Sequence, residues 1–249
     1  MIIRKTPAEI EIMREAGRLS ARALRLVGEA VRPGVSTAEL DEIAESTIVD
    51  GGGAPAFKGY HGFPKTLCTS LNDQVVHGIP AKDVRLKSGD IVSVDVGAIV
   101  DGYFGDTART FAVGEVSAEA SRLLERTQAA LAEGIGRCRP GQRLFDIGAA
   151  VQSVAESAGF SVVREYVGHG IGQSMHEDPN VPNFGKAGTG IELLEGMVFA
   201  VEPMVNAGGA EVTQLDDGWT VVTRDGSLSA HFEHTVAITL DGPLVLTVE

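Results

Sequence analysis

Two halves of this sequence resemble each other, and this internal repeat restricts the possible folds more than any other feature. The tripeptide Arg-Pro-Gly occurs at 32–34 and again at 139–141, and the apolar segment GDIVSVD (89–95) returns as GMVFAVE (196–202). Each recurrence comes 107 residues later in the chain (139 minus 32, and 196 minus 89). Because the two offsets agree, we interpret the halves as related αβ units, with chance similarity as the alternative.

Helix signals surround both copies of the tripeptide. At the start of the chain, Thr6 and Glu9 can form a capping box, and Pro7 stands at the first helical position. This pattern predicts a helix that ends near Ala30. Comparable patterns predict further helices at 36–51, 117–138 and 144–158.

The repeat also sets our expectation for the domain organisation. A chain of 249 residues is long enough for one large domain or two small ones. We expect one α+β domain over 1–249. Its halves, approximately 1–113 and 114–249, would pack about a pseudo-twofold axis.

A predicted β-hairpin at 89–113 brings two aspartates onto one face of a sheet. Its two-residue turn is Asp101-Gly102, so antiparallel pairing sets Asp95 opposite Ala108 and Asp106 one diagonal step away. Diagonal side chains lie about 7–8 Å apart, which suits two carboxylates that converge on one cation. A carboxylate inside the apolar run VSVDV is rarely buried without a partner charge or a metal. On its own, Asp106 would also fit an ordinary turn.

Two further acids stand at comparable places in apolar strands. Glu202 ends the repeated segment, at the position equivalent to Asp95, and Glu233 precedes the apolar run TVAITL. Two like charges about 4 Å apart repel by roughly 4 kcal/mol when the effective dielectric constant is about 20. Divalent cations would remove this repulsion, and four carboxylates match two such ions in charge. Arginine or lysine partners are the alternative, and we favour the metal.

Three histidines are candidates for the nitrogen ligand that a transition metal prefers over Mg²⁺ or Ca²⁺. His77 lies in VVHGIP, His169 in GHGIG and His176 in SMHEDP. Each of them alone would more often be a structural residue. Together they predict three glycine- or proline-flanked loops, which commonly present reactive side chains on a rigid scaffold.

Composition excludes several other classes of protein. The net charge of −13 argues against general nucleic-acid binding, which requires a basic surface. No apolar run approaches the roughly 18 residues that a membrane span requires, and the first residues lack the apolar core of a secretory signal. We therefore expect a cytoplasmic protein. Cys68 and Cys138 are expected to be free thiols, and neither belongs to a zinc-binding CxxC pair.

At these residues the chain resembles the type I methionine aminopeptidases, a family of pita-bread metallopeptidases. The resemblance covers nearly the whole chain. It is carried, in the family's order, by GYHGFPKTLCTSLND, VVHGIP, VDVGAIVDGYFGDTARTF, GHGIGQSMHEDPNVPNFG, EGMVFAVEPMVN and DDGWTVVTRDGSLSAHFEHTVAIT. It implies the pita-bread (creatinase/aminopeptidase) fold, in which two pseudo-twofold-related αβ halves surround a central antiparallel sheet. It also implies that the single domain is catalytic.

The resemblance assigns roles to the acids and histidines. It implies five metal ligands, with Asp106 and Glu233 bridging two ions of Co, Mn, Fe or Zn. The implied reaction is removal of the initiator methionine from nascent proteins whose second residue is small and uncharged, by water that the dinuclear centre activates. Glu202 would be the general base, His176 would stabilise the oxyanion, and His77 would contact the scissile amide. The five implied ligands are Asp95, Asp106, His169, Glu202 and Glu233.

A substrate pocket and a second cation site are also implied. Asn72 and Ser229 resemble a site for one monovalent cation. Phe63 and Met175 stand where the family has tyrosine and phenylalanine, which affects the expected shape of the methionine pocket, and an ordinary apolar core is the alternative reading of such residues. The implied pocket consists of Tyr60, Phe63, Cys68, Met175 and Trp219, with His61 at its rim.

The implied partners are the N-termini of nascent polypeptides, with the ribosome as an open alternative. Neither a membrane nor a specific nucleic acid is expected, and a monomer is our default. Two rival functions remain open on the sequence. A proline-specific peptidase shares the fold and the five ligands, and a metal-free binding module of the same fold would have lost ligands that this chain retains.

Overall fold

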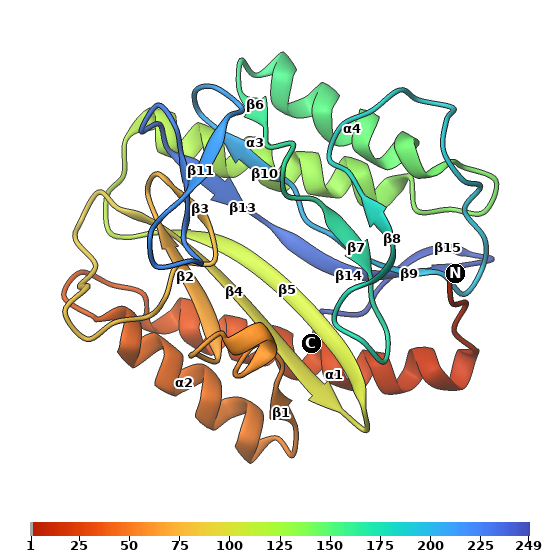
Figure 1. The fold of residues 1–249 in the computed structure, drawn as a ribbon, viewed down its shortest axis with the longest axis horizontal. Helices are drawn as coiled ribbons and strands as arrows, with labels where there is room; N and C mark the ends of the chain where they lie inside the picture. Colours follow the sequence, from red (N-terminus) through yellow and green to blue (C-terminus); the bar gives the residue numbers. More distant parts are fainter. Residues whose placement is uncertain (1) are drawn as a thin grey trace.

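A nine-stranded antiparallel sheet organises residues 2–249, the part of the chain that the computed structural model describes (Figure 1). The strands run in the order β1-β4-β5-β14-β9-β7-β8, with β2 paired to β4 and β15 paired to β14. Their bounds are β1 Ala54–Pro55, β2 Leu67–Leu71, β4 Ile91–Val100, β5 Tyr103–Ala112, β7 Gly168–Gly170, β8 Glu177–Val181, β9 Val198–Val201, β14 Glu233–Thr239 and β15 Gly242–Val245.

Two three-stranded sheets flank the large one. The first has the order β13-β10-β6, and the second has the order β11-β12-β3. Their bounds are β3 Gln74–Val76, β6 Ser161–Val162, β10 Met204–Asn206, β11 Val212–Gln214, β12 Val221–Thr223 and β13 Ser229–His231.

The four predicted helices are confirmed. They are α1 (Pro7–Ala30), α2 (Thr37–Asp50), α3 (Ala118–Gly136) and α4 (Leu144–Ser157). Thr6 and Ser36 each form the predicted capping box, with the glutamate three residues later bonded back to the cap. Figure 1 shows α1 and α2 along one half of the sheet and α3 and α4 along the other. No helix within residues 2–249 has the length and apolar character that a bilayer crossing requires.

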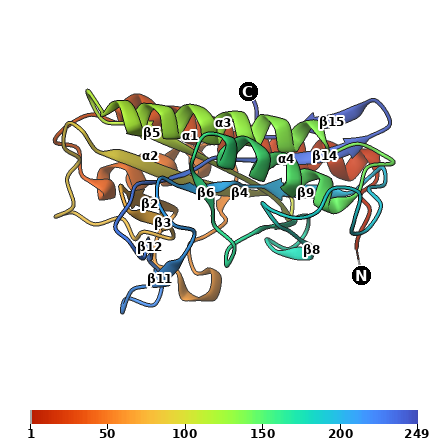
Figure 2. The ribbon, with the colours of Figure 1, turned by 90° about the horizontal axis from the view of Figure 1, so that it is seen from above.

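Strand alternation separates the two faces of the sheet. Gly105 faces α1 so closely that a Cβ atom there would lie 2.5 Å from the backbone nitrogen of Gly17, so the helix rests directly on the strand. Successive side chains of a strand point to opposite faces, and Asp106 therefore points away from the helices. Figure 2 shows α1 and α3 on one side of the sheet and β3, β11 and β12 on the other. The acidic residues thus lie on the helix-free face.

Contacts that recur 107 residues apart relate the two halves. The Gly34 N–H donates to the Leu86 carbonyl at 2.8 Å, and the Gly141 N–H donates to the Leu193 carbonyl at 3.2 Å. Two isolated antiparallel bridges follow the same offset: they are Ser36 with Arg85, and Arg143 with Glu192. The equivalent hydrogen bonds agree with two related αβ halves, as the repeat predicts.

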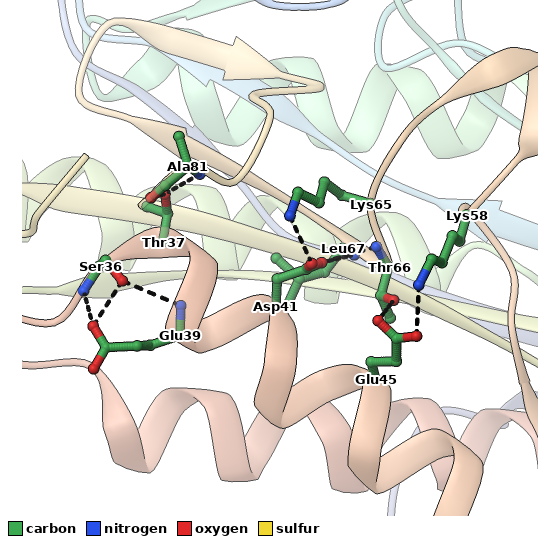
Figure 3. A network of polar contacts seen from close by, with 10 residues as sticks. All are labelled: Ser36, Thr37, Glu39, Asp41, Glu45, Lys58, Lys65, Thr66, Leu67 and Ala81. Atoms are coloured by element: carbon green, nitrogen blue, oxygen red, sulfur yellow. Dashed lines mark hydrogen bonds and ion pairs between the residues drawn. The ribbon is translucent and has the colours of Figure 1, made fainter. Parts of the chain in front are cut away.

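A polar network from α2 fixes the loop that precedes β2 (Figure 3). The buried carboxylate of Asp41 accepts the backbone N–H groups of Thr66 and Leu67 at 2.8 and 3.1 Å. One turn later, Glu45 lies 2.6 Å from the Lys58 ammonium. The two acids therefore hold both ends of the segment that contains the short 3₁₀ turn η1 (Tyr60–Gly62).

Replacing Asp41 with asparagine is expected to loosen this segment. A carboxylate that accepts two buried N–H groups is a charge-assisted acceptor, and losing its charge should lower the free energy of unfolding by about 1–3 kcal/mol. Urea unfolding measures the change. Glu42→Gln is the matched control, because Glu42 is an exposed acid on the same helix. Equal stability of the two variants would contradict the anchoring role of Asp41.

Candidate active site

Three neighbouring strands carry a row of side chains on the helix-free face. Asp95 on β4 lies opposite Ala108 on β5, and Ala108 lies opposite Glu233 on β14. Asp106 shares the face of Ala108 and lies opposite Gly97, so the predicted diagonal relation to Asp95 is confirmed. The small side chain of Ala108 leaves the centre of the row open to the three acids around it.

Hydroxyl groups fix the backbone of this row. Thr235 Oγ1 accepts the Asp106 N–H at 3.0 Å and donates to the Asp106 carbonyl at 2.8 Å. Thr107 Oγ1 donates to the Glu233 carbonyl at 2.8 Å. These bonds join β5 to β14, and they therefore set the separation of the two buried acids.

The second half supplies Glu202 and His169. The registers on either side, Val201 opposite His234 and Met204 opposite His231, place Glu202 opposite Glu233. Glu202 was predicted to lie inside a strand, but it lies in the break between β9 and β10 that the following proline produces.

His169 was predicted in a loop, and this was wrong, because it lies on β7 opposite Ala200. Its neighbouring glycines explain the strand. A Cβ atom at Gly168 would lie 2.3 Å from the Ala200 carbonyl oxygen, and one at Gly170 would lie 2.3 Å from the Asp178 carbonyl oxygen. Only glycine at positions 168 and 170 allows the two neighbouring strands to approach β7 this closely.

The acids and the histidine converge. Ligand atoms of Asp106, His169 and Glu233 all lie within 4.8 Å of one another, and all three residues are buried. His169 Nε2 lies 3.4 Å from Glu202 Oε1. Among buried polar atoms of the described residues, Asp95 Oδ1, Asp106 Oδ1 and Glu233 Oε1 have no hydrogen-bond partner. Unpartnered carboxylate oxygens that share one buried centre fit divalent cations.

The tautomer of His169 supports the same conclusion. Its Nδ1 lies 2.9 Å from the Gly170 carbonyl oxygen, which can only accept, so Nδ1 carries the proton. Burial lowers the pKa of His169 to about 3, so its ring is neutral and Nε2 presents a lone pair. This lone pair lies 3.4 Å from Glu202 Oε1, so the two acceptor atoms fit a shared cation or a shared proton.

Burial also shifts the pKa values of the acids upward. The pKa of Asp106 rises to about 7 because the group is buried. Burial, together with the charge of Asp106, raises the pKa values of Asp95, Glu202 and Glu233 well above their ordinary range. The cluster therefore carries more negative charge than the protein itself can stabilise.

Metal uptake is expected to displace protons from this cluster. The folded pKa of Asp106, about 7, exceeds the 3.8 of an unperturbed aspartate. Its protonation thus stabilises the metal-free fold below about pH 4, and this contribution is lost as the pH rises through about 7. Saturating Mn²⁺ should raise the Tm more at about pH 8 than at about pH 6, since protons compete less for the ligands. Scanning calorimetry of chelated and loaded protein measures both shifts, and equal shifts would contradict the prediction.

His77 and His176 lie on either side of the cluster. His77 follows β3 with a left-handed backbone (φ 62°), and its ring centroid lies 6.5 Å from that of Trp219. His176 precedes β8, and its ring centroid lies 4.2 Å from that of His169. The Tyr60 hydroxyl lies 2.8 Å from His176 Nδ1. Both histidines can therefore reach a molecule bound beside the acids.

One cavity of about 230 Å³ unites these groups with the predicted pocket. All five predicted ligands, His77, His176 and the six predicted pocket residues line it. Phe63 and Trp219 form its apolar end, with ring centroids 5.1 Å apart in an edge-to-face arrangement. Cys68 pairs with Asp95 across β2 and β4, and burial raises the pKa of its thiol, which stays protonated. Cys68 and Cys138 are free thiols, as predicted, and both are buried.

Two residues near the site were missed on the sequence. Phe57 also lines the cavity, and nothing in its local sequence distinguishes it from a core phenylalanine. His231 lies 3.7 Å from Glu202 through its Nε2. A signal for His231 did exist, because residues two apart on a strand share a face and His231 precedes Glu233 by two.

Asn72 and Ser229 are brought together at a distance from the acids. The Ser229 N–H donates to the Asn72 carbonyl at 2.8 Å, and Asn72 has a left-handed backbone (φ 54°). Neither residue lines the cavity that holds the acids.

Comparison with known proteins places this architecture in a class. The profile of Metallopeptidase family M24 matches residues 11–240. A solved methionine aminopeptidase from Thermotoga maritima superimposes with a TM-score of 0.99 and 46% identity, and one from Rickettsia prowazekii with 0.97 and 47%; both comparisons cover 100% of each chain. A prolidase from Pyrococcus furiosus, at 24% identity and a TM-score of 0.79 over 99% of this chain and 66% of its own, shares the fold. Fold and site thus define a pita-bread metallopeptidase.

Sequence similarity identifies the family within this class of metallopeptidases. A methionine aminopeptidase of Clostridium acetobutylicum is 52% identical over 248 residues, which is 100% of this chain and 99% of the relative. That of Escherichia coli K12 is 49% identical over 245 residues, which is 98% and 93% of the two chains. The chain belongs to the methionine aminopeptidases of metallopeptidase family M24. The predicted family and fold are therefore confirmed.

Proposed function

We propose that this protein removes the initiator methionine from nascent polypeptides whose second residue is small and uncharged. One observation carries the proposal: a single cavity joins a buried acid–histidine cluster to an apolar pocket of aromatic and sulfur-containing side chains. The first element suits hydrolysis by metal-activated water, and the second suits a thioether side chain.

The cluster would hold two divalent cations through Asp95, Asp106, His169, Glu202 and Glu233. Asp106 and Glu233 would bridge them, since their ligand atoms already lie within 4.8 Å of each other and of His169. When bound, two such ions supply an activated water and polarise the scissile carbonyl. The nitrogen and oxygen ligands accept Co, Mn, Fe or Zn.

Glu202 would be the general base. Its side chain is 14% exposed, so it reaches the cavity, whereas Glu233 on the opposite strand is 2% exposed. Burial and the neighbouring charge of Asp106 raise the pKa of Glu202, which makes it a stronger proton acceptor than an ordinary glutamate. The same carboxyl can then pass the proton to the departing amine.

His176 would stabilise the developing oxyanion. Burial raises the pKa of Tyr60, so its hydroxyl stays protonated, and in our proposal it donates to His176 Nδ1, 2.8 Å away. Burial also lowers the pKa of His176, so its neutral ring keeps one proton, on Nε2. A fixed N–H donor near a carbonyl is the arrangement that lowers the barrier of acyl transfer.

The remaining groups would position the substrate. His77 would contact the scissile amide, and the negative charge of Asp95 would attract the free α-amine. The methionine side chain would enter the pocket between Phe63, Trp219 and Met175. A substrate without a free N-terminus would lack this contact with Asp95, which would restrict cleavage to the first residue.

Release of methionine from Met-Ala-Ser by Mn²⁺-loaded protein tests the proposal, with cleavage of an Ala-Pro bond as the comparison. Methionine release without Ala-Pro cleavage is the expected result. Cleavage of Ala-Pro alone would assign a proline-specific activity, and metal binding without turnover would assign a binding role. Acetylated Met-Ala-Ser is the control, since the blocked amine should prevent cleavage.

Several broader assignments accompany this proposal. We propose one catalytic domain over 1–249, with halves of approximately 1–113 and 114–249, acting in the cytoplasm on nascent chains. Asn72 and Ser229 would contribute to a site for one monovalent cation, because a left-handed asparagine and the Ser229 backbone meet there.

A further inference from the structure

His231 is a buried imidazole to which the catalytic proposal assigns no role. Its side chain is 2% exposed, and it lies on β13, immediately before the break that separates this strand from β14. His231 Nε2 is the one nitrogen among the buried side-chain atoms of residues 2–249 that have no hydrogen-bond partner. Three of the other such atoms belong to Asp95, Asp106 and Glu233. The unpartnered nitrogen of His231 therefore lies beside the acid cluster, 3.7 Å from Glu202 Oε2.

The strand register directs His231 toward Glu202. His231 lies opposite Met204 on β10, and Glu202 precedes Met204 by two residues, so His231 and Glu202 are diagonal neighbours on one face. His231 Nε2 lies 3.7 Å from Glu202 Oε2, while His169 Nε2 lies 3.4 Å from Glu202 Oε1. The Glu202 carboxylate therefore stands between two imidazoles, with one oxygen toward each.

The backbone of His231 is fixed from both sides by one hydroxyl. Thr110 Oγ1 accepts the His231 N–H at 2.8 Å and donates to the His231 carbonyl at 2.9 Å. Ser93 Oγ lies 2.8 Å from the same hydroxyl. Residues that hold a functional side chain are most effective on rigid elements of this kind.

The two imidazoles differ in what they can offer Glu202. The single proton of His169 is used at Nδ1 on the Gly170 carbonyl, so its Nε2 is an acceptor that faces the cluster. His231 Nε2 has no other hydrogen-bond partner, so an N–H at this atom is free to point at Glu202 Oε2, 3.7 Å away. Of the two rings, only His231 can donate to the carboxylate.

We infer that His231 is a positioning residue for Glu202. The Nε2–H of His231 would hold Glu202 Oε2, so that Glu202 Oε1 stays directed toward the other proposed metal ligands and the attacking water. The inference rests on the proposed function, because it assigns a partner to the acid proposed as general base. Partners behind a ligand orient it and tune its basicity, and losing one typically costs about 10–100-fold in metal affinity or activity.

Two substitutions at position 231 test the hydrogen bond. His231→Leu removes the donor at similar volume, whereas His231→Gln retains an uncharged N–H. We expect His231→Leu to lose about 10–100-fold in Mn²⁺ affinity by titration calorimetry or in kcat on Met-Ala-Ser, with KM little changed. His231→Gln should recover most of that loss. His234→Leu is the matched control, because His234 points to the other face of the sheet and contacts the Thr247 hydroxyl at 2.8 Å.

Wild-type affinity and kcat in His231→Leu, or the same loss in His231→Gln as in His231→Leu, would overturn the inference. The calorimetric readout separates this outcome from failure of the proposed function. If the wild type binds Mn²⁺ but releases no methionine, the function is wrong, and the Mn²⁺ affinities of the variants still decide the role of His231.

A measurement on the wild-type protein keeps the test valid if a variant fails to fold. In the Zn²⁺-loaded form, long-range ¹H–¹⁵N spectra distinguish the two tautomers of each histidine. The expected result is protonated Nε2 at His231 and protonated Nδ1 at His169. An unprotonated Nε2 at His231 would contradict the hydrogen bond to Glu202.

Discussion

Glu202→Gln is expected to lower kcat by at least about 10³-fold while metal remains bound, since general-base catalysis contributes typically ~10²–10⁴-fold and the acid also orients the water. The amide of glutamine cannot accept the proton that water must lose. It can still present an oxygen to the cluster, and the remaining ligands come from other strands. The loss should therefore appear mainly in kcat.

The experiment pairs steady-state kinetics on Met-Ala-Ser with metal analysis of the same preparation. Glu195→Gln is the control, because Glu195 is an exposed acid in the loop before β9. Near-normal turnover by Glu202→Gln with full metal occupancy would remove Glu202 from the role of base. A large loss of metal would instead mean that Glu202 acts chiefly as a ligand.

The second large effect is expected at two buried residues of the proposed ligand set, the bridging Glu233 and the nitrogen ligand His169. Glu233→Gln and His169→Ala should abolish turnover and also weaken metal occupancy. Glu233 is 2% exposed and its Oε1 has no partner within the protein, so its charge has no evident use other than cation binding. Removing that charge also lowers the repulsion among the acids, so the metal-free variant should be at least as stable as metal-free wild type.

Metal content after dialysis, kcat and the Tm of the metal-free form together test this prediction. Asp241→Asn is the control, since Asp241 is an exposed acid in the turn between β14 and β15. Full activity of Glu233→Gln would show that the bridging assignment is wrong. Destabilisation of its metal-free form would show that Glu233 has a structural partner.

Much of the fold could be predicted because its signals are local or periodic. Thr6 and Ser36 announce helix starts through capping boxes, and the Asp101-Gly102 turn fixes the register that sets Asp95 opposite Ala108. The offset of 107 residues predicted two related halves, and the equivalent hydrogen bonds of Gly34 and Gly141 agree with it. Such features depend on a few residues each, so a single sequence contains them.

The parts that could not be predicted depend on contacts between distant segments. His169 lies on a strand because Gly168 and Gly170 let two neighbouring strands approach. No local pattern of strand-forming residues predicts this strand. Phe57 lines the cavity together with residues from distant segments, such as Met175 and Trp219, and no local pattern reveals this. The contact of His231 with Glu202 could not be predicted, because the two residues become neighbours only when β10 pairs with β13.

Division of the acid cluster between two halves links cation capture to completion of the fold. On the proposed ligand set, Asp95 and Asp106 come from the hairpin of the first half, whereas His169, Glu202 and Glu233 follow only in the second. A growing polypeptide that ends before β14 lacks the last acid, so it has no finished place for the ions. The bound cations would then cross-link β5 of the first half to β14 of the second. Removing the metal would weaken the pairing of these two strands before it destabilised either half.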